Sequence, residues 1–209
     1  MSFNKNSALI LIVANGINLL INFITLPFLS RSLSYEDFGT YNQLVLVGSL
    51  FQMLFCLGIS SILNVIATQH REDEKYIFSS ANFLLLCSAI IASVFILFFY
   101  ILKIDFFENP QFNKGLLIYL PSIFFIIITP HLTLQLVYYK KVKQMGISIV
   151  VTNVLRILLL FIAVYYIKTL SALLFSLVII YALQFLLYNI ILLKDVAFYS
   201  VKFKKKLLG

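Results

Sequence analysis

Charge is what this sequence has least of. Only 11% of its 209 residues are Asp, Glu, Lys or Arg, whereas 62% are hydrophobic. Ordinary globular domains are about 25% charged and about 45–50% apolar. A soluble domain of this length could not bury so much apolar surface, because a large share of any folded chain stays exposed. The composition therefore excludes an ordinary soluble domain and predicts an integral membrane protein.

Acidic and metal-ligating residues are also scarce. The chain has 8 Asp and Glu residues together, 2 His and 2 Cys. No Asp or Glu lies within the long apolar stretches, so no carboxylate pair is available there for acid–base chemistry. The His and Cys residues show no metal-ligand spacing, and no phosphate-binding glycine loop is present. We therefore expect no metal, no cofactor and no enzymatic activity.

Long uncharged stretches are what the sequence has in abundance. Five of them occupy 6–30, 38–70, 76–102, 115–139 and 169–193, and a sixth over 144–167 holds a single charge, Arg156. A helix that crosses the hydrocarbon core needs roughly 20 predominantly apolar residues. The pattern predicts an all-α polytopic membrane protein, with one six-helix lobe over 1–193 and a basic tail over 194–209. The expected spans are 7–29, 39–66, 77–102, 115–138, 146–167 and 170–193.

The second expected span is too long for a straight crossing. Its 28 residues would make a helix of about 42 Å, against a hydrocarbon core of about 30 Å. It must tilt, project or bend, and Gly58 is the expected bend point. Pro27 and Gly39 are expected to bound a polar hairpin before this span. Pro121 and Pro130 are expected to kink the fourth span. Membrane helices tolerate such kinks because neighbouring helices satisfy the backbone groups that the proline frees.

Lysine and arginine are unevenly divided between the two ends of the expected spans. One side carries 11 of them and the other carries 4, with Arg156 left over. Cytoplasmic segments carry the excess, so both termini are predicted to face the cytoplasm. The basic runs YYKKVK and KFKKK then serve orientation and contact with anionic lipid headgroups. We do not expect nucleic acid as a partner.

Amide side chains form a stripe on the first expected span. Asn15, Asn18 and Asn22 follow at spacings of three and four, which places them on one helix face. Gln52 belongs to a comparable stripe on the second span. Amides that face lipid would leave hydrogen-bonding groups unused, so both stripes should face protein or water. They are either bonds between packed helices or the lining of a polar cavity, and the sequence leaves both readings open.

Arg156 lies at the middle of the sixth stretch, with Thr152 and Asn153 one turn earlier on the same face. A cation at that depth costs at least about 2.5–3.5 kcal/mol on insertion scales. Backbone carbonyls or the amides of neighbouring helices could hold it as a structural cation. However, the expected spans offer no carboxylate as its partner. We therefore favour a cavity whose anion is a phosphate or carboxylate from outside the protein, which a guanidinium grips bidentately.

The first hairpin carries a family resemblance. The segments LPFLSRSLSYEDFGTYN and LGISSIL resemble the polysaccharide-biosynthesis flippases of the Wzx type, in the multidrug/oligosaccharidyl-lipid/polysaccharide exporter superfamily. The family pattern reads LP-x-LSR-x-L-x-x-x-x-[FY]-G-x-[FY], followed by LG-[IL]-x. The residues that match it are Leu26, Pro27, Leu29, Ser30, Arg31, Leu33, Phe38, Gly39, Tyr41, Leu57 and Gly58.

This resemblance implies a function and a partner. It implies movement of an undecaprenyl-diphosphate-linked oligosaccharide from the inner to the outer leaflet of a bacterial cytoplasmic (inner) membrane. The diphosphate and sugars would enter a polar cationic cavity. The substrate-binding residues would be Arg156, Asn153, Thr152, Asn15, Asn18, Asn22 and Gln52, with Arg31 at the outer mouth. Family members pair two six-helix lobes, and this chain supplies one, so a second lobe or a homodimer is expected. The alternatives are a lobe of a multidrug/cation antiporter of the same superfamily and a non-transporting assembly subunit.

Overall fold

The computed structural model describes residues 5–56, 58–69, 71–102 and 109–193, and these residues are helical with no strand among them. The helices are α1 (Lys5–Ser32), α2 (Tyr35–Cys56), α3 (Ile59–Gln69), η1 (Arg71–Asp73), α4 (Glu74–Ile101), α5 (Pro110–Tyr138), α6 (Val142–Ile162), the π-helical turn η2 (Ala163–Ile167) and α7 (Leu170–Leu192). The all-α expectation is therefore confirmed for the described residues. The expected tail, 194–209, lies outside them.

Five helical segments of the described chain are long and apolar enough to cross a membrane. They are Leu9–Ser32, Glu74–Ile101, Gln111–Tyr138, Val142–Ile167 and Leu170–Leu192. Each overlaps one of the six expected spans. The chain is therefore a multi-pass helical protein by the length and composition of its helices. The side of the membrane on which its ends lie stays a prediction.

The expectation of a continuous second span over 39–66 is wrong. The helix ends at Cys56, and a new one, α3, begins at Ile59. Gly58 lies between them with a φ of +65°, a left-handed conformation that glycine adopts without the steric cost other residues bear. The bend expected at Gly58 is thus confirmed as a full break. Neither α2 nor α3 reaches the length and hydropathy of a membrane span on its own.

The polar hairpin expected from Pro27 to Asn42 is also largely helical. Pro27 lies inside α1, which continues to Ser32, and Gly39 lies inside α2. Ser34 starts the second helix: its hydroxyl accepts from the Asp37 N–H at 3.1 Å and donates to the Asp37 carboxylate at 2.9 Å. With this cap, only two residues, Leu33 and Ser34, separate the end of α1 from the start of α2. Glu36 and Asp37 occupy the first turn of α2, as expected, where the helix dipole favours acids.

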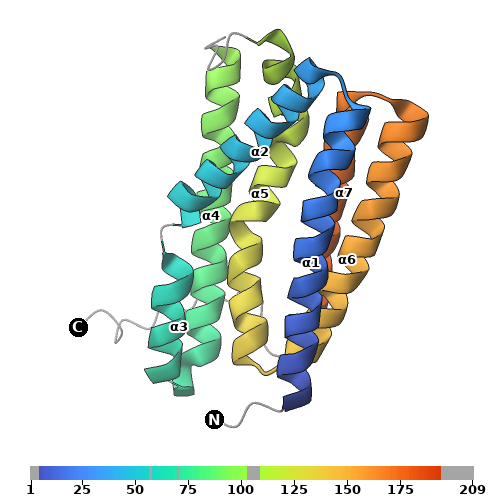
Figure 1. The fold of residues 1–209 in the computed structure, drawn as a ribbon. Coiled ribbons are helices and arrows are strands. Elements are labelled where there is room, and N and C mark those ends of the chain that lie inside the picture. The colour runs from blue at the N-terminus through green and yellow to red at the C-terminus, as the bar shows by residue number, and fades with distance from the viewer. Residues whose placement is uncertain (1–4, 57, 70, 103–108, 194–209) are drawn as a thin grey trace.

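The helices run up and down the bundle (Figure 1). The start of α1, the α3–α4 junction and the α5–α6 turn lie at one end, and the α1–α2 and α6–α7 turns lie at the other. The basic connections Arg71–Lys75 and Lys140–Lys143 therefore share an end. This arrangement agrees with the alternation that the charge count requires. The face of the membrane that this end occupies stays a prediction.

Helix α5 is the central element of the fold. It packs against α2, α4 and α7, while α1 lies along α6, which in turn packs on α7. Its inward residues are among the most buried of the molecule, including Ile123, Ile127 and Leu136. Both Pro121 and Pro130 lie within this continuous helix. The result is a core around α5, with α1 and α6 forming a pair at its flank.

Candidate functional site

A polar cleft of about 460 Å³ opens where α1, α6 and α7 meet. It contains six of the residues selected from the sequence, namely Asn15, Asn18, Asn22, Thr152, Asn153 and Arg156. We call it the arginine cleft. Further residues of α2, α5, α6 and α7 complete its wall: Val45, Thr133, Ile149, Leu177, Ile180, Tyr181, Gln184 and Tyr188.

Helix spacing and helix packing together build this cleft. The asparagines at spacings of three and four share one face of α1, and Thr152, Asn153 and Arg156 share one face of α6. Because α1 packs lengthwise on α6, both faces turn toward the same space. Gly146 lies close to the start of α6, where that helix contacts the first turns of α1. An added Cβ at Gly146 would meet the Ile10 side chain at 2.7 Å. The small residue thus allows the close approach of the two helices.

The guanidinium of Arg156 is held by a neutral partner. Its Nη1 donates a 2.8 Å hydrogen bond to the Asn22 side-chain oxygen across the α1–α6 contact. Its Nε–H is buried and has no hydrogen-bond partner among the described residues. The amide orients the cation and leaves its charge uncompensated, since no Asp or Glu lines the cleft.

The neighbouring asparagine side chains have unused hydrogen-bond donors and acceptors. Within the described part of the chain, the side chains of Asn15, Asn18 and Asn153 make no hydrogen bond to protein. Thr152 differs, because its hydroxyl donates to the Ser148 carbonyl of its own helix at 2.9 Å. Unpaired amides in an apolar bundle are costly unless water or a ligand meets them. The stripe on α1 thus lines a cleft, with Asn22 alone bonded to another helix.

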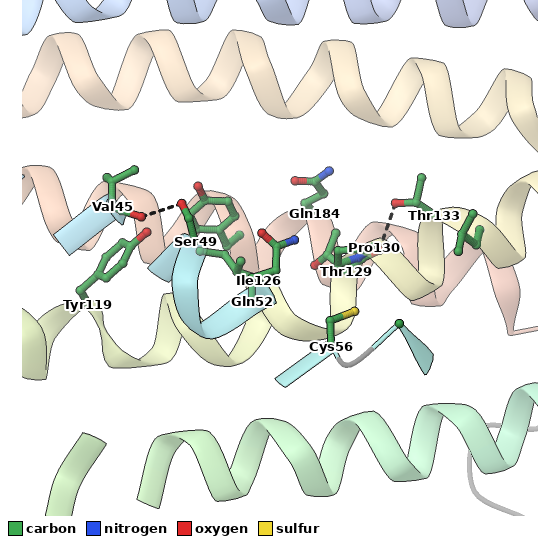
Figure 2. A pocket seen from close by; sticks show the side chains of 13 residues that line it. Val45, Ser49, Gln52, Cys56, Tyr119, Ile126, Thr129, Pro130, Thr133 and Gln184 are labelled. Carbon is green, nitrogen blue, oxygen red and sulfur yellow. Dashed lines mark hydrogen bonds between the residues drawn. The ribbon is translucent and has the colours of Figure 1, made fainter. Parts of the chain in front are cut away.

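A second cleft, of about 630 Å³, adjoins the first between α2, α5 and α7 (Figure 2). Gln52 lies here, so we call it the glutamine cleft. Its other lining residues are Val45, Ser49, Cys56, Gly58, Tyr119, Ile126, Thr129, Pro130, Thr133, Leu134, Tyr181 and Gln184. Val45, Thr133, Tyr181 and Gln184 line both clefts, so the two form one continuous hollow.

Arg31 is the selected residue that the structure sets apart. It lies in the exposed last turn of α1 and lines neither cleft. Conversely, sequence reasoning missed a polar stripe on α7, formed by Tyr181, Gln184 and Tyr188. Their spacings of three and four in an otherwise apolar stretch were a readable signal. Thr129 and Thr133 give the same signal on α5.

The joined clefts offer two chemistries side by side. The arginine cleft presents a cation with free amides, which suits the oxygens of a phosphate or carboxylate. The glutamine cleft presents amides, hydroxyls and aromatic rings without a charged side chain. An apolar bundle with such a hollow can take a polar headgroup while its outer surface stays in lipid. We read this hollow as the candidate binding site.

A family model described as polysaccharide biosynthesis protein matches residues 5–208 of the chain. This match covers nearly the whole sequence. No curated protein and no solved structure matches the chain significantly.

Proposed function

The chain belongs to the polysaccharide biosynthesis protein family, and from that premise we propose that it is one lobe of a lipid-linked oligosaccharide flippase. Its substrate would be a glycan carried on undecaprenyl diphosphate, moved from the inner to the outer leaflet of a bacterial cytoplasmic membrane. The product would supply a surface polysaccharide such as O-antigen or capsule. The protein would catalyse no covalent step and need no cofactor.

The observation that carries this proposal is the position of Arg156. Its guanidinium lies in a cleft within the helical bundle, oriented by a neutral amide and uncompensated by any lining carboxylate. A diphosphate supplies the negative charge that the protein lacks there, and the planar guanidinium matches its oxygens. The prenyl chain would stay in lipid against the apolar outer faces of the helices.

Movement across the membrane requires a second body. Alternating access operates by rocking two bundles around a shared central site. Both clefts here are open, so a facing wall would enclose the substrate. We propose that this wall is a second six-helix lobe, or a second copy of this chain in the same membrane orientation.

The chemistry of the hollow favours this proposal over a cation antiporter lobe. Antiporters of the superfamily usually bind their coupling ions with acids inside the membrane. Asp and Glu are absent between residues 38 and 71, 75 and 104, and 109 and 194. A cation substrate would also meet the repulsion of Arg156 in the arginine cleft.

Ligand binding tests the first half of the proposal. The purified chain in lipid nanodiscs should bind undecaprenyl diphosphate more tightly than undecaprenol, measured by native mass spectrometry or by thermal shift. The diphosphate alone distinguishes the two lipids, so the difference reports the anion site. Equal binding of both lipids would contradict the proposed substrate class.

Complementation tests the second half. In a flippase-deficient bacterial strain, the chain co-expressed with a compatible second lobe should restore surface polysaccharide. If the second body is another copy, a purified dimer should accompany rescue by the chain alone. Rescue by a chain shown to be monomeric in the membrane would overturn the requirement for two bodies.

A further inference from the structure

We propose that the glutamine cleft is a sugar subsite, which holds the first saccharide of the substrate while Arg156 holds the adjoining diphosphate. This inference rests on the proposed function and deepens it. It assigns the two chemistries of the hollow to the two parts of the headgroup. It also names Gln52 and Gln184 as the residues that select the sugar.

Gln52 and Gln184 lie near the centre of the cleft, one from α2 and the other from α7 (Figure 2). The Gln52 amide makes no hydrogen bond to protein within the described residues, so its two N–H donors and its oxygen are available. The Gln184 Nε2 donates to the Tyr188 hydroxyl at 3.0 Å, and its carbonyl oxygen accepts no hydrogen bond from another described residue. Two amides thus present free donors and acceptors to the same space.

The serine and threonine hydroxyls of the cleft act mainly as acceptors. Ser49 donates to the Val45 carbonyl at 2.8 Å, and Thr133 donates to the Thr129 carbonyl at 3.0 Å (Figure 2). Thr129 in turn donates to the Phe125 carbonyl at 2.7 Å. Since each hydroxyl hydrogen is used within its own helix, the oxygen lone pairs face the cleft as acceptors.

An acceptor-rich wall discriminates between sugar and phosphate. A phosphate offers only acceptors at its charged oxygens, so it finds few partners here and better ones at Arg156. Sugar hydroxyls both donate and accept, so they can use the hydroxyl oxygens and the glutamine amides together. Ile126, Pro130 and Leu134 add apolar surface for the C–H face of a sugar ring.

Position and size agree with this assignment. The clefts join at Thr133, Tyr181 and Gln184, and the first sugar is covalently attached to the diphosphate, so the two groups must occupy adjacent space. A volume of about 630 Å³ falls within the usual range of about 300–1,000 Å³ for small-molecule sites.

The test compares a bare carrier with sugar-bearing carriers. The probes are undecaprenyl diphosphate and the same lipid carrying a single glucose, galactose, N-acetylglucosamine or N-acetylgalactosamine. The purified chain in nanodiscs should bind at least one sugar-bearing probe about tenfold more tightly than the bare carrier. Gln52→Met and Gln184→Met keep the side-chain volume and should each remove most of that gain. Gln52→Met, whose residue lines the glutamine cleft and not the arginine cleft, should bind the bare carrier as the wild type does.

Asn42→Leu is the matched control. Asn42 is an amide on the same helix as Gln52, but its Nδ2 donates to the Phe38 carbonyl at 2.9 Å and it lines neither cleft. It should keep the full gain from the sugar. No gain for any sugar, or a gain that survives both glutamine substitutions, overturns the subsite. Failure of the wild type to bind even the bare carrier would instead refute the proposed function.

Discussion

Two polar regions of this molecule use similar side chains in opposite ways. At the α4–α5 contact, Gln135 Nε2 donates to Asn82 Oδ1 at 2.8 Å, and both side chains are buried. His131, one turn before Gln135, is wholly buried beside them. In the joined clefts, Asn15, Asn18, Asn153 and Gln52 line the hollow and make no hydrogen bond to another described residue. An amide side chain inside this apolar bundle thus either hydrogen-bonds to a neighbouring helix or is available to bind a ligand.

The comparison separates stability from binding. Removing one member of the α4–α5 pair leaves a buried group without its partner, so the folded state should suffer. Removing a cleft amide takes away a group that the protein itself does not use, so binding alone should suffer. Substitutions in the two regions should therefore have different readouts, and the predictions below begin with the largest effect.

Arg156→Gln should weaken the binding of undecaprenyl diphosphate by about 10- to 100-fold. Hydrogen bonds to a charged group are worth about 1.5–3 kcal/mol, and each 1.4 kcal/mol is tenfold in affinity. Arg156→Lys should keep part of the affinity, because the charge remains without the bidentate fork. Titration of the purified variants measures this. Lys143→Gln, which removes an exposed cation outside both clefts, is the control. Wild-type affinity in Arg156→Gln would make Arg156 a structural cation.

Asn82→Leu and Gln135→Met should each lower the free energy of unfolding by about 1–3 kcal/mol, because each leaves a buried amide unpaired. The double variant should recover much of this loss, since it replaces both partners by apolar groups of similar shape. Thermal unfolding followed by circular dichroism at 222 nm measures it. Losses that simply add in the double variant would show that the two amides are not coupled across the α4–α5 contact.

Gly58→Ala should destabilise the protein by about 1–2 kcal/mol, because the left-handed conformation of this residue opposes a Cβ. No described atom beyond its chain neighbours would meet the new methyl group within 4 Å, so backbone strain is the expected cause of the effect. Gly16→Ala is the matched control: its site is equally open but lies inside α1. That control should be neutral or stabilising by about 0.5–1 kcal/mol. Equal melting temperatures for both variants would contradict a strained break at Gly58.

Asn18→Leu should have the smallest effect on ligand binding. A neutral hydrogen bond contributes about 0.5–1.5 kcal/mol, which corresponds to a loss of roughly two- to twelvefold in affinity. The melting temperature should stay unchanged or rise, because no protein group loses a partner. Affinity and thermal unfolding are measured on the same preparation. A lower melting temperature with unchanged affinity would show that Asn18 is a structural amide. It would contradict the proposed difference between the α4–α5 contact and the joined clefts.

The sequence by itself determined the class of the fold and the ingredients of the arginine cleft. Apolar stretches of about the thickness of a bilayer leave a chain little choice but helices, because only internal hydrogen bonding satisfies the backbone in lipid. The regular spacing of Asn15, Asn18 and Asn22 fixed a shared face on α1, and the depth of Arg156 marked it as unusual. Local periodicity suffices for these conclusions, since residues on one helix have a known angular relation.

The tertiary structure decided which faces meet. Sequence could not show that the face of Arg156 turns toward Asn22, because this helix pairing joins residues that are 134 positions apart in the chain. It also could not separate Gln135, bonded to Asn82, from Gln52, which faces the glutamine cleft. The break at Gly58 was expected only as one of several ways to fit a long segment. The final arrangement depended on α2 and α3 each packing against α5, a non-local contact that no periodicity encodes.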